Sequence, residues 1–354
     1  MPEFEQYYQE LRLVAPGTQL YEGLENILRA RTGALIVVGD TPEVMALVNG
    51  GFKIDAEFHP AALYELAKMD GAIILSADTK RILAANTMLT PDPMIPSHET
   101  GTRHRTAERV ARQTGQLVIA ISQRRNVITI YKGGWKYILR DVSVVLAKAN
   151  QALATLEKYK SVFQQSLTNL SALEFEDLVT LGDVTTVLQR SQMVNRIANE
   201  ISGYVIQLGS EGRLVHMQLE ELMGDIKDEG LLVFKDYVQL PDINPVEAWA
   251  EMEKWDSEDL LNMSLMNKAL GYSSSISAYE QPVVPRGYRI LSKIPRLPMP
   301  VIENLVREFS NLPAVMEASI EELDDVEGIG EVRAKAIKEG LRRLREQVLV
   351  DRQL

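Results

Sequence analysis

The sequence predicts a multidomain protein in which an α/β domain with a mixed sheet is followed by all-α segments. Helical and strand patterns alternate from residue 18 to about residue 139. Long-period helical patterns follow to about residue 208, and short helices joined by tight turns occupy the region beyond residue 300. Alternating helices and strands are typical of an α/β domain, whereas helices alone indicate an all-α one. The 354 residues are enough for two or three domains of roughly 100–200 residues.

The first region opens with an amphipathic pattern over residues 18–31, which predicts a helix closed by Gly33. ALIVVGD (34–40) predicts a buried strand, and HPAALYELAKM (59–69) predicts a helix that begins at Pro60. Further short apolar runs separated by polar turns predict the remaining strands. These runs are AIILS (72–76), RILAANTML (81–89), LVIAISQ (117–123) and VITIYKG (127–133).

The helical region extends from Asp141 to about Leu208 and continues in RLVHMQLEELMGDI (213–226) and near DLLNMSLMNKAL (259–270). Between Gly271 and Pro300 the chain is rich in serine and proline, which suits a connection more than a core element. We therefore predict three domains, over residues 1–140, 141–288 and 289–354.

Composition excludes several classes of protein. Because the chain has no cysteine, it has neither disulfides nor sites that need a thiolate. The first residues, MPEFEQYYQELRLVAPG, do not follow the order of a signal peptide, and no run reaches the ~20 apolar residues of a membrane span. We expect a cytoplasmic protein without membrane contact. The net charge of −11 argues against coating nucleic acid with the whole surface, so any contact with nucleic acid must be local.

The stretch GTRHRTAER (101–109) places Arg103, His104 and Arg105 side by side where a helix is expected to begin. Positive charge is mildly unfavourable at a helix N-terminus unless an anion arrives to meet it. The inward stripe of this helix, Ala107, Val110, Ala111 and Thr114, ends at Gly115. The segment therefore predicts an anion site at a helix N-terminus.

Arg103 and Thr106 extend that inward stripe and should point towards the edge of the sheet. His104 and Arg105 are rotated from Arg103 by roughly 100° and 200° about a regular helix, so the three basic groups cannot grip one atom. Either the turn is irregular, or the groups serve different phosphates or a neighbouring subunit. The alternative is a surface helix with solvated arginines.

Asp70 and Gly71 lie immediately before the apolar strand 72–76. Asp-Gly is a common turn dipeptide, but glycine also lets a ligand approach the backbone closely. A carboxylate together with arginines, histidine and threonines is the equipment of metal-assisted phosphoryl or nucleotidyl transfer. The sequence has neither GxxxxGK[ST] nor GxGxxG after a strand, so the common nucleotide-binding loops are excluded.

DGA (70–72), GTRHRTAER (101–109) and SQRRN (122–126) together resemble the diadenylate cyclase family. This resemblance implies condensation of two ATP molecules to cyclic di-AMP with release of two pyrophosphates. It also implies one ATP per subunit, two subunits that face each other, and a divalent metal ion, Mg²⁺ or Mn²⁺. Basic groups on several sides of the helix would then have both a subunit's own triphosphate and the partner's nucleotide to contact.

Carried over to this sequence, the resemblance makes Asp70 the catalytic aspartate and the metal ligand, with Arg103, His104 and Arg105 as the other catalytic residues. Gly71 and Leu89 would border the nucleoside. The residues implied to bind ATP are Asp70, Gly71, Leu89, Thr102, Arg103, His104, Arg105, Thr106 and Ser122.

Near the end of the chain, Gly328-Ile329-Gly330 lies between apolar residues that predict two packed helices. Glycines permit a turn whose N–H groups point outward at the start of the second helix, which suits a DNA phosphate. Residues 328–345 contain six basic and two acidic side chains, a local net charge of +4. The alternative is a hairpin used only for packing or oligomerisation. The residues predicted to bind DNA are Gly328, Ile329, Gly330, Arg333, Lys335 and Lys338.

The resemblance covers the whole chain. GYVIQLGSEGRLVHMQLEELM (203–223) resembles the helical linker of the branch of the family that scans DNA integrity, and the C-terminus resembles its helix-hairpin-helix module. The resemblance implies regulation by branched DNA and a homo-oligomer, an octamer with facing cyclase domains. The alternatives are a catalytically silent nucleotide-binding DNA scaffold and a structural oligomer in which nucleotide only joins subunits.

Overall fold

The computed structural model describes residues 6–239, 244–273 and 276–351. The chain divides into two compact units, one of residues 1–149 with 202–216 and one of residues 150–201 with 217–354. The first unit is α/β with a mixed sheet, and the second is helical. The predicted fold class is therefore confirmed, whereas the boundaries at residues 140 and 288 stay predictions.

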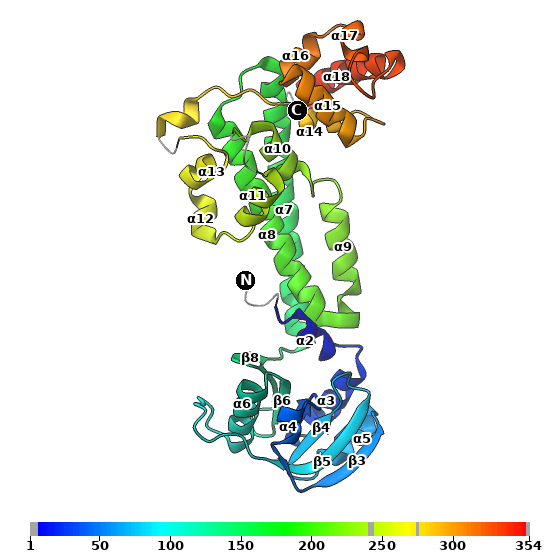
Figure 1. Ribbon diagram of the computed structural model, residues 1–354, viewed down its shortest axis with the longest axis vertical. Helices are drawn as coiled ribbons and strands as arrows, with labels where there is room; N and C mark the ends of the chain where they lie inside the picture. Colours follow the sequence, from blue (N-terminus) through cyan, green and yellow to red (C-terminus); the bar gives the residue numbers. More distant parts are fainter. Residues whose placement is uncertain (1–5, 240–243, 274–275, 352–354) are drawn as a thin grey trace. The chain divides into compact units, whose positions relative to one another are not determined.

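The first unit is built around one sheet whose strands run in the order β2-β5-β4-β1-β6-β7-β8, with β3 paired to β5 (Figure 1). Its described elements are α2 (Tyr8–Leu13), α3 (Gln19–Arg29), β1 (Ala34–Val38), α4 (Pro42–Met45), β2 (Val48–Asn49), β3 (Phe52–Glu57), α5 (Pro60–Leu66), β4 (Ala72–Leu75), β5 (Arg81–Leu89), α6 (Thr102–Thr114), β6 (Leu117–Ser122), β7 (Val127–Lys132) and β8 (Trp135–Ile138).

The register of three central strands brings distant parts of the chain to one edge of the sheet. β1 and β4 are parallel, with Leu35 opposite Ala72, so the residues that precede both strands are neighbours. β6 is antiparallel to β1, with Ile121 opposite Ala34, so the end of β6 reaches the same edge. We call this edge, with Gly33, Asp70, Gly71 and Ser122, the Asp70 edge.

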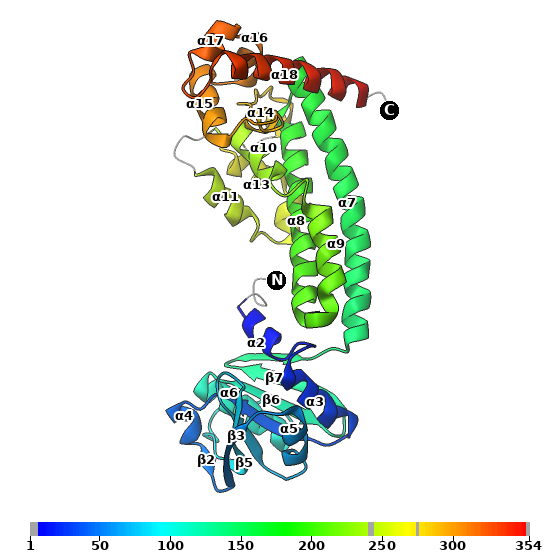
Figure 2. The same cartoon turned by 90° about the vertical axis from the view of Figure 1, so that its right-hand side faces the viewer.

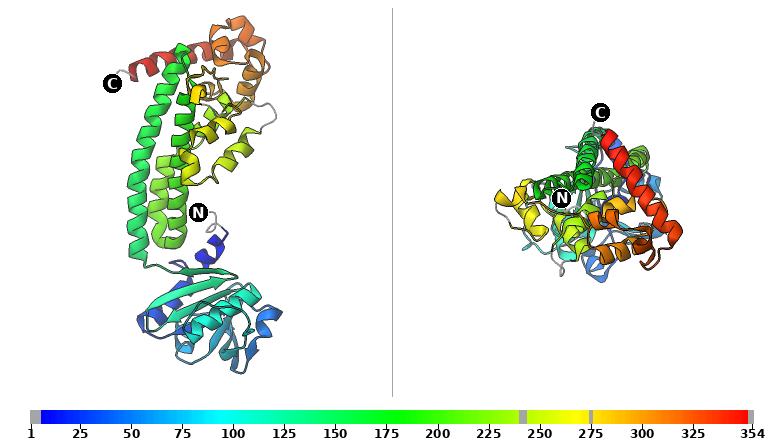
Figure 3. Two further views of the ribbon diagram at one scale, coloured as in Figure 1. Left: turned by 90° about the vertical axis from the view of Figure 1, so that its left-hand side faces the viewer. Right: turned by 90° about the horizontal axis from the view of Figure 1, so that it is seen from above.

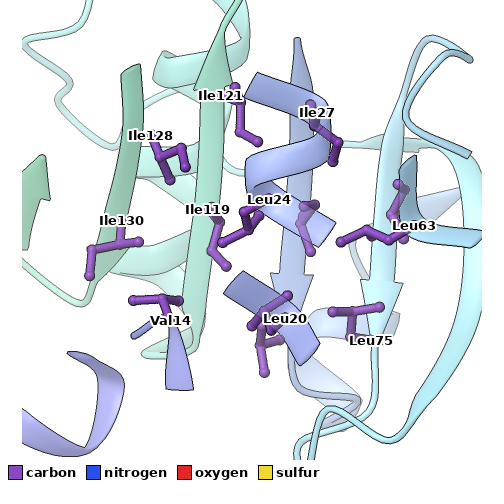
Figure 4. Close-up of a cluster of buried hydrophobic side chains, with 14 of the residues drawn as sticks. Val14, Leu20, Leu24, Ile27, Leu63, Leu75, Ile119, Ile121, Ile128 and Ile130 are labelled. Atoms are coloured by element: carbon purple, nitrogen blue, oxygen red, sulfur yellow. The ribbon is translucent and has the colours of Figure 1, made fainter. Parts of the chain in front are cut away.

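Helices cover both faces of the sheet. On one face, α3 and α5 pack onto the strands, and Figure 4 shows Leu24 and Ile27 from α3 near Ile119 and Ile121 from β6. On the other face, residues of α4 and α6 join a second cluster with alternate residues of β1 and β4. β1, β4 and β6 are therefore buried on both sides, which explains why their sequences are continuous apolar runs.

Not every element follows its sequence pattern. The helix expected over residues 18–31 ends at Arg29, and Arg31 rather than Gly33 takes the left-handed conformation, with φ 54°. The prediction that Gly33 closes this helix is thus wrong. β3 escaped prediction because most of its residues are exposed, so it lacks an apolar alternation.

The helical unit contains most of two long helices and a series of shorter ones (Figures 1 and 2). Its described helices are α7 (Val142–Glu176), α8 (Leu181–Leu208), α9 (Arg213–Met223), α10 (Glu229–Tyr237), α11 (Pro245–Met252), α12 (Ser257–Leu261), α13 (Met263–Ala269), α14 (Tyr288–Ser292), α15 (Met299–Phe309), α16 (Leu312–Glu317), α17 (Ile320–Asp324) and α18 (Glu331–Asp351). The first residues of α7 and α9 and the last of α8 belong to the first unit.

The segment Gly271–Pro300 is not only a connection, as its composition suggested. It contains α14, whose Arg289 is fully buried and whose Ile290 and Leu291 lie in the core of the C-terminal helices. The side chains that surround Arg289 come from α7 and α10. α14 packs against α10 and α18, as Figure 2 shows, and α18 is the red helix in both views of Figure 3.

A buried polar network joins α7, α10 and α14. The Arg289 guanidinium pairs with the Glu174 carboxylate, which also accepts a hydrogen bond of 2.8 Å from the Tyr237 hydroxyl. The Asp236 carboxylate accepts from the backbone N–H groups at the start of α14, at 2.7, 2.6 and 3.1 Å. Burial raises the pKa of Asp236 to about 7, with the Glu174 carboxylate acting in the same direction. Three helices are therefore held together through charges that water does not reach.

Replacing Arg289 with Met should strongly destabilise the helical unit. The substitution leaves the Glu174 carboxylate buried without its partner, and breaking a buried pair in this way costs about 3–5 kcal/mol. Urea unfolding followed by far-UV circular dichroism measures the loss. Arg342→Met is the control, because Arg342 pairs with Glu339 on an exposed helix face, where an ion pair contributes less than about 1 kcal/mol. Equal effects of the two substitutions would show that the buried pair is not a structural anchor.

Candidate active site

The predicted anion-site helix is α6, which begins at Thr102 after Gly101 and ends at Gly115 in the left-handed conformation. Its inward residues Ala107, Val110 and Ala111 are fully buried against the sheet. The predicted helix is confirmed, and so is its inward stripe at these three residues, whereas Thr114 is only half-buried. Because the turn at Arg103 is regular helix, the three basic side chains leave it in different directions.

Arg103 points to the Asp70 edge, as the inward stripe predicted. Its guanidinium lies against the backbone of Gly33, where a Cβ atom would be only 2.1 Å from Nη1. Nη2 is 3.8 Å from Oδ1 of Asp70, and about a third of the Arg103 side chain is exposed. The guanidinium is therefore held beside a carboxylate at a position that solvent reaches.

Asp70 presents a fully exposed carboxylate from a fixed backbone. The side-chain amide of Asn86 donates a hydrogen bond of 2.6 Å to the Asp70 carbonyl oxygen. Gly71 has φ 99°, and a Cβ there would lie 2.8 Å from backbone atoms of Asn86 and Thr87. The glycine is thus required by the neighbouring strand, whereas the sequence suggested close approach of a ligand.

His104 is half-buried, and burial lowers its pKa. The Glu99 carboxylate opposes this effect, while the charges of Arg103, Arg125 and Lys136 reinforce it. The imidazole is therefore mostly neutral at pH 7 and can donate one hydrogen bond. Lys136 is paired with Glu99. Arg103 and Arg125 therefore supply the positive charge beside His104 that Glu99 does not compensate, and this charge favours an anion on that side of α6.

Glu99 links the segment before α6 to the sheet. It accepts a hydrogen bond of 2.9 Å from the Tyr131 hydroxyl and forms an ion pair with Lys136. Burial acts to raise the pKa of Glu99, but hydrogen bonds from Lys136 and Tyr131 outweigh it and hold the pKa below its usual value. Glu99 is therefore ionised at neutral pH and fixes the end of the segment 90–101.

Arg105 turns away from Asp70 and fastens the same segment. Its guanidinium donates to the backbone carbonyls of Glu99 and Thr100, at 3.3 and 3.4 Å. Farther along α6, Arg109 donates to the Ile95 carbonyl at 2.9 Å, and the buried Glu108 carboxylate accepts from the Ser97 hydroxyl at 2.5 Å and the His98 N–H at 3.1 Å. The outer face of α6 thus holds the chain that precedes it.

The remaining site predictions fall in different surroundings. Thr102 is exposed and Thr106 half-buried on the first turns of α6. The Ser122 hydroxyl accepts from the Arg125 N–H at 3.1 Å, inside the β6–β7 turn at the Asp70 edge. Leu89 is buried in the core cluster with Val44. The structure brings together Asp70, Gly71 and Arg103, with Ser122 at the same edge, while the roles of Leu89 and Arg105 at a nucleotide stay predictions.

No cluster of three or more histidine, aspartate or glutamate side chains that could hold a metal ion occurs among the described residues. Mg²⁺, however, is commonly bound by one or two carboxylates together with substrate phosphates and water. The exposed carboxylate of Asp70, beside a guanidinium that can take a phosphate, fits an ion that arrives with a nucleotide.

Sequence reasoning missed several residues of this site. Asn86 and Gly33 carry no motif, because their importance comes from atoms that lie far along the chain. Glu99 lies within the quoted segment but was not selected, since only the fold brings Tyr131 and Lys136 to it. The sequence also could not predict that the charge of Arg125 lies near His104, although the motif SQRRN (122–126) had been noted.

The C-terminal hairpin joins α17 to α18, as predicted. Gly328 has φ 85°, and a Cβ there would lie 3.2 Å from the Val301 side chain. A larger residue is therefore disfavoured both by the backbone conformation and by the close contact. Ile329 is 8% exposed and packs into the helical core. Gly330 is more open, with Asp324 Oδ1 at 3.9 Å as the nearest atom to its Cβ position. Within the described residues, the backbone N–H groups of Gly330 and Glu331 make no hydrogen bond, so they can take a phosphate.

The basic residues of the hairpin have partners. Arg333 donates to the Gly328 carbonyl, and Lys335 pairs with Glu331 at 2.5 Å. Lys338 donates to the Met316 and Ala318 carbonyls, at 2.7 Å each, and so caps the end of α16. These contacts fix the basic side chains but leave the local net charge of +4 unchanged, because Glu331 is already counted in it and backbone carbonyls are neutral. Lys338 has a structural role that the sequence did not reveal. Their contact with DNA stays a prediction.

Comparison with known families divides the chain in the same order as the structure. A model described as the DisA bacterial checkpoint controller nucleotide-binding region matches residues 21–135. A model of the DisA bacterial checkpoint controller linker region matches residues 139–279, and a helix-hairpin-helix motif matches residues 312–340. No described helix is long and apolar enough to cross a membrane.

Similar proteins are named DNA integrity scanning protein DisA. The protein from Carboxydothermus hydrogenoformans is 64% identical over 95% of this chain and 96% of its own length. That from Symbiobacterium thermophilum is 60% identical over 98% of both chains, and that from Clostridium botulinum strain Loch Maree is 56% identical over 97% and 96%. With matches of this identity over nearly the full length, the chain belongs to the DisA family of diadenylate cyclases.

Proposed function

We propose that this chain condenses two ATP molecules into cyclic di-AMP with release of two pyrophosphates, and that branched DNA bound at the hairpin lowers the rate. The observation that carries the proposal is the exposed Asp70 carboxylate beside the Arg103 guanidinium, 3.8 Å apart. A carboxylate for a metal and a cation for a phosphate are the two charges that nucleotidyl transfer needs together.

In each half-reaction the 3′-hydroxyl of one ATP attacks the α-phosphorus of the other. A phosphorus–oxygen bond forms, the bond to pyrophosphate breaks, and the hydroxyl gives its proton to the Asp70 carboxylate, which passes it to water. Mg²⁺ or Mn²⁺ held by Asp70 would neutralise charge on the phosphates and acidify the attacking hydroxyl. Arg103 binds phosphate oxygens, and the neutral His104 donates a hydrogen bond to the same group. Thr102, Thr106 and Ser122 supply hydroxyl donors around it.

Joining two nucleotides requires a second subunit, because each Asp70 edge offers one carboxylate and one Arg103. Phe52 on β3 and Met88 on β5 are 61% and 67% exposed, so apolar side chains of this unit are available to a partner. The family resemblance further implies an octamer, eight subunits built into such facing pairs, and the composition favours the cytoplasm as its location.

The control by DNA rests on the hairpin. Free N–H groups at the start of α18 form a phosphate site, and a hairpin that binds phosphates reads DNA shape rather than base sequence. Preference for branched DNA fits such a reader, because a junction presents phosphates in arrangements that a straight duplex lacks.

The alternative is a nucleotide-binding DNA scaffold without turnover. Incubating the full chain with ATP and Mn²⁺, and detecting cyclic di-AMP and pyrophosphate by mass spectrometry, separates the two. Specific activity should fall as the enzyme is diluted below its assembly constant, since one subunit cannot join two nucleotides. ATP binding without cyclic di-AMP at any protein concentration would favour the scaffold.

Asp70→Asn should lower kcat by at least the ~10²–10³-fold typical of losing one transition-state electrostatic contact. The substitution keeps the shape of the side chain but removes the charge that a metal needs. The rate of cyclic di-AMP formation measures the effect. Asp40→Asn is the control, because Asp40 is an exposed aspartate beyond the opposite end of β1 and should leave the rate unchanged. A native rate for Asp70→Asn would remove this carboxylate from the reaction.

Arg103→Ala and Arg105→Ala should both reduce activity, but for different reasons. Arg103→Ala removes a phosphate contact, and a hydrogen bond to a charged group contributes about 1.5–3 kcal/mol, so ATP affinity should fall about 10–100-fold. Arg105→Ala releases the Glu99 and Thr100 carbonyls, so hydrogen exchange should become faster over residues 97–101. Arg103→Ala should leave that exchange unchanged. If the exchange rates of residues 97–101 are the same in both variants, Arg105 does not act by holding the segment 90–101.

Gly330→Asp should abolish DNA binding without unfolding the hairpin, because the site has room for a side chain but a carboxylate there repels a phosphate. Fluorescence anisotropy with a four-way junction measures binding. A plot of the log of the binding constant of the native chain for duplex DNA against the log of the salt concentration should have a slope of about −0.9 per phosphate neutralised. The matched control is Gly134→Asp in the cyclase unit, where no atom lies within 4 Å of the added Cβ. The junction should inhibit the native enzyme and the control but not Gly330→Asp, and equal inhibition of all three would place the sensor elsewhere.

A further inference from the structure

We propose that Gly33 and Asn86 are positioning residues that hold Arg103 and Asp70 as an open pair, close together but not hydrogen-bonded. Gly33 sets the position of the guanidinium and Asn86 that of the aspartate backbone. This inference rests on the proposed function, because an open pair matters only if each charge has a phosphate or metal to take.

The need for glycine at residue 33 comes from the closeness of Arg103. Gly33 is not among the residues in the left-handed region, so its backbone conformation would accept a side chain. A Cβ there, however, would lie 2.1 Å from Nη1, 2.8 Å from Cζ and 3.2 Å from Nη2 of Arg103, and these three guanidinium atoms are its nearest neighbours. Since they belong to the flexible end of a side chain, an alanine would displace Arg103 and leave the fold intact.

The backbone around Gly33 is fixed on both sides. Before it, the Arg31 and Thr32 N–H groups donate to carbonyls of Leu28 and Ile27 at the end of α3, at 3.0 and 3.3 Å. After it, Ala34 begins β1 and pairs with Ile121. The guanidinium therefore lies on a surface that is anchored to α3 and the sheet, and its position is set by structure that does not move with the side chain.

Asn86 fixes the other charge. It occupies the left-handed region with φ 53°, where the irregular register between β4 and β5 lies. From there its side-chain amide donates a hydrogen bond of 2.6 Å to the Asp70 carbonyl oxygen. Asparagine tolerates this conformation better than most residues with a side chain, so one residue both allows the bend and holds the Asp70 peptide.

The distance that results is functionally useful. At 3.8 Å, Nη2 of Arg103 and Oδ1 of Asp70 are close enough for their charges to attract each other. Their separation is nevertheless longer than the roughly 2.7–2.9 Å of a charge-assisted hydrogen bond. A direct bidentate pair would occupy both carboxylate oxygens and two guanidinium N–H groups. The open pair leaves the carboxylate oxygens available to a metal ion and the N–H groups available to a phosphate.

The first test is a double-mutant cycle between residues 33 and 103. Gly33→Ala should weaken ATP binding, measured by titration calorimetry, and should lower kcat by about the 10²-fold that a 1 Å misplacement can cost. In the Arg103→Ala background the same substitution should have no further effect, because no guanidinium remains to be displaced. Gly134→Ala is the matched control, with no atom within 4 Å of the added Cβ. The melting temperature of Gly33→Ala should match that of the control.

The second test concerns Asn86. Asn86→Gly keeps the left-handed backbone accessible but removes the amide, so the Mn²⁺ concentration for half-maximal activity should rise several-fold. In the Asp70→Asn background it should have little effect. Thr79→Gly is the control, because Thr79 also has a positive φ, 60°, but lies in the turn at the far end of β4.

The outcomes separate this inference from the proposed function. If the native chain binds ATP but makes no cyclic di-AMP, the proposed function fails, and the binding cycle with Arg103→Ala still tests Gly33. If Gly33→Ala weakens ATP binding equally with and without Arg103, Gly33 acts on something other than the guanidinium and the inference is overturned. Unchanged binding in Gly33→Ala would overturn it as well.

Discussion

Parallel pairing of β1 with β4 is the constraint on which the site depends. Because Leu35 lies opposite Ala72, the residues just before the two strands become neighbours although nearly forty positions separate them in sequence. This register places Gly33 next to the Asp70 turn, and α6, packed on the same strands, brings Arg103 between them. A one-residue slip of β4 would turn every side chain of that strand to the opposite face and would move Asp70 away from Arg103.

The regular start of α6 explains why three basic residues stand side by side. Each successive residue is rotated by about 100°, so Arg103 faces Asp70, His104 faces Glu99 and its neighbouring cations, and Arg105 faces the carbonyls that precede the helix. Only one of the three makes an ion pair with the aspartate. One side chain therefore lies beside the carboxylate, one remains neutral by burial, and one holds the segment from which the helix starts.

The two ends of the chain use charge differently. In the cyclase unit, Asp70 and Arg103 are exposed enough to meet a ligand. In the helical unit, Arg289 and Glu174 are fully buried and tie α14 to the long helix α7. This contrast distinguishes an open charge pair that solvent reaches from a closed one that holds a structure together.

The sequence predicted the fold class, the buried strands and the glycine hairpin because each depends on local periodicity or turn residues. It also predicted that Arg103 points to the sheet edge, since that follows from helix geometry. It could not predict that Gly33 makes room for Arg103, that Lys338 caps α16 or that Arg289 is buried, because each depends on atoms brought together only by folding. The serine- and proline-rich composition of Gly271–Pro300 wrongly suggested only a connection. The five residues of α14 are too few to change the average composition of that segment.

A crystal structure of the chain with Mn²⁺ and 3′-deoxy-ATP, which lacks the attacking hydroxyl, tests the central claim most directly. The anomalous signal of the metal should lie within coordinating distance of the Asp70 carboxylate. The triphosphate should contact the Arg103 guanidinium while Arg105 stays on the Glu99 and Thr100 carbonyls. A nucleotide bound away from the Asp70 edge, or a metal that Asp70 does not touch, would contradict the account.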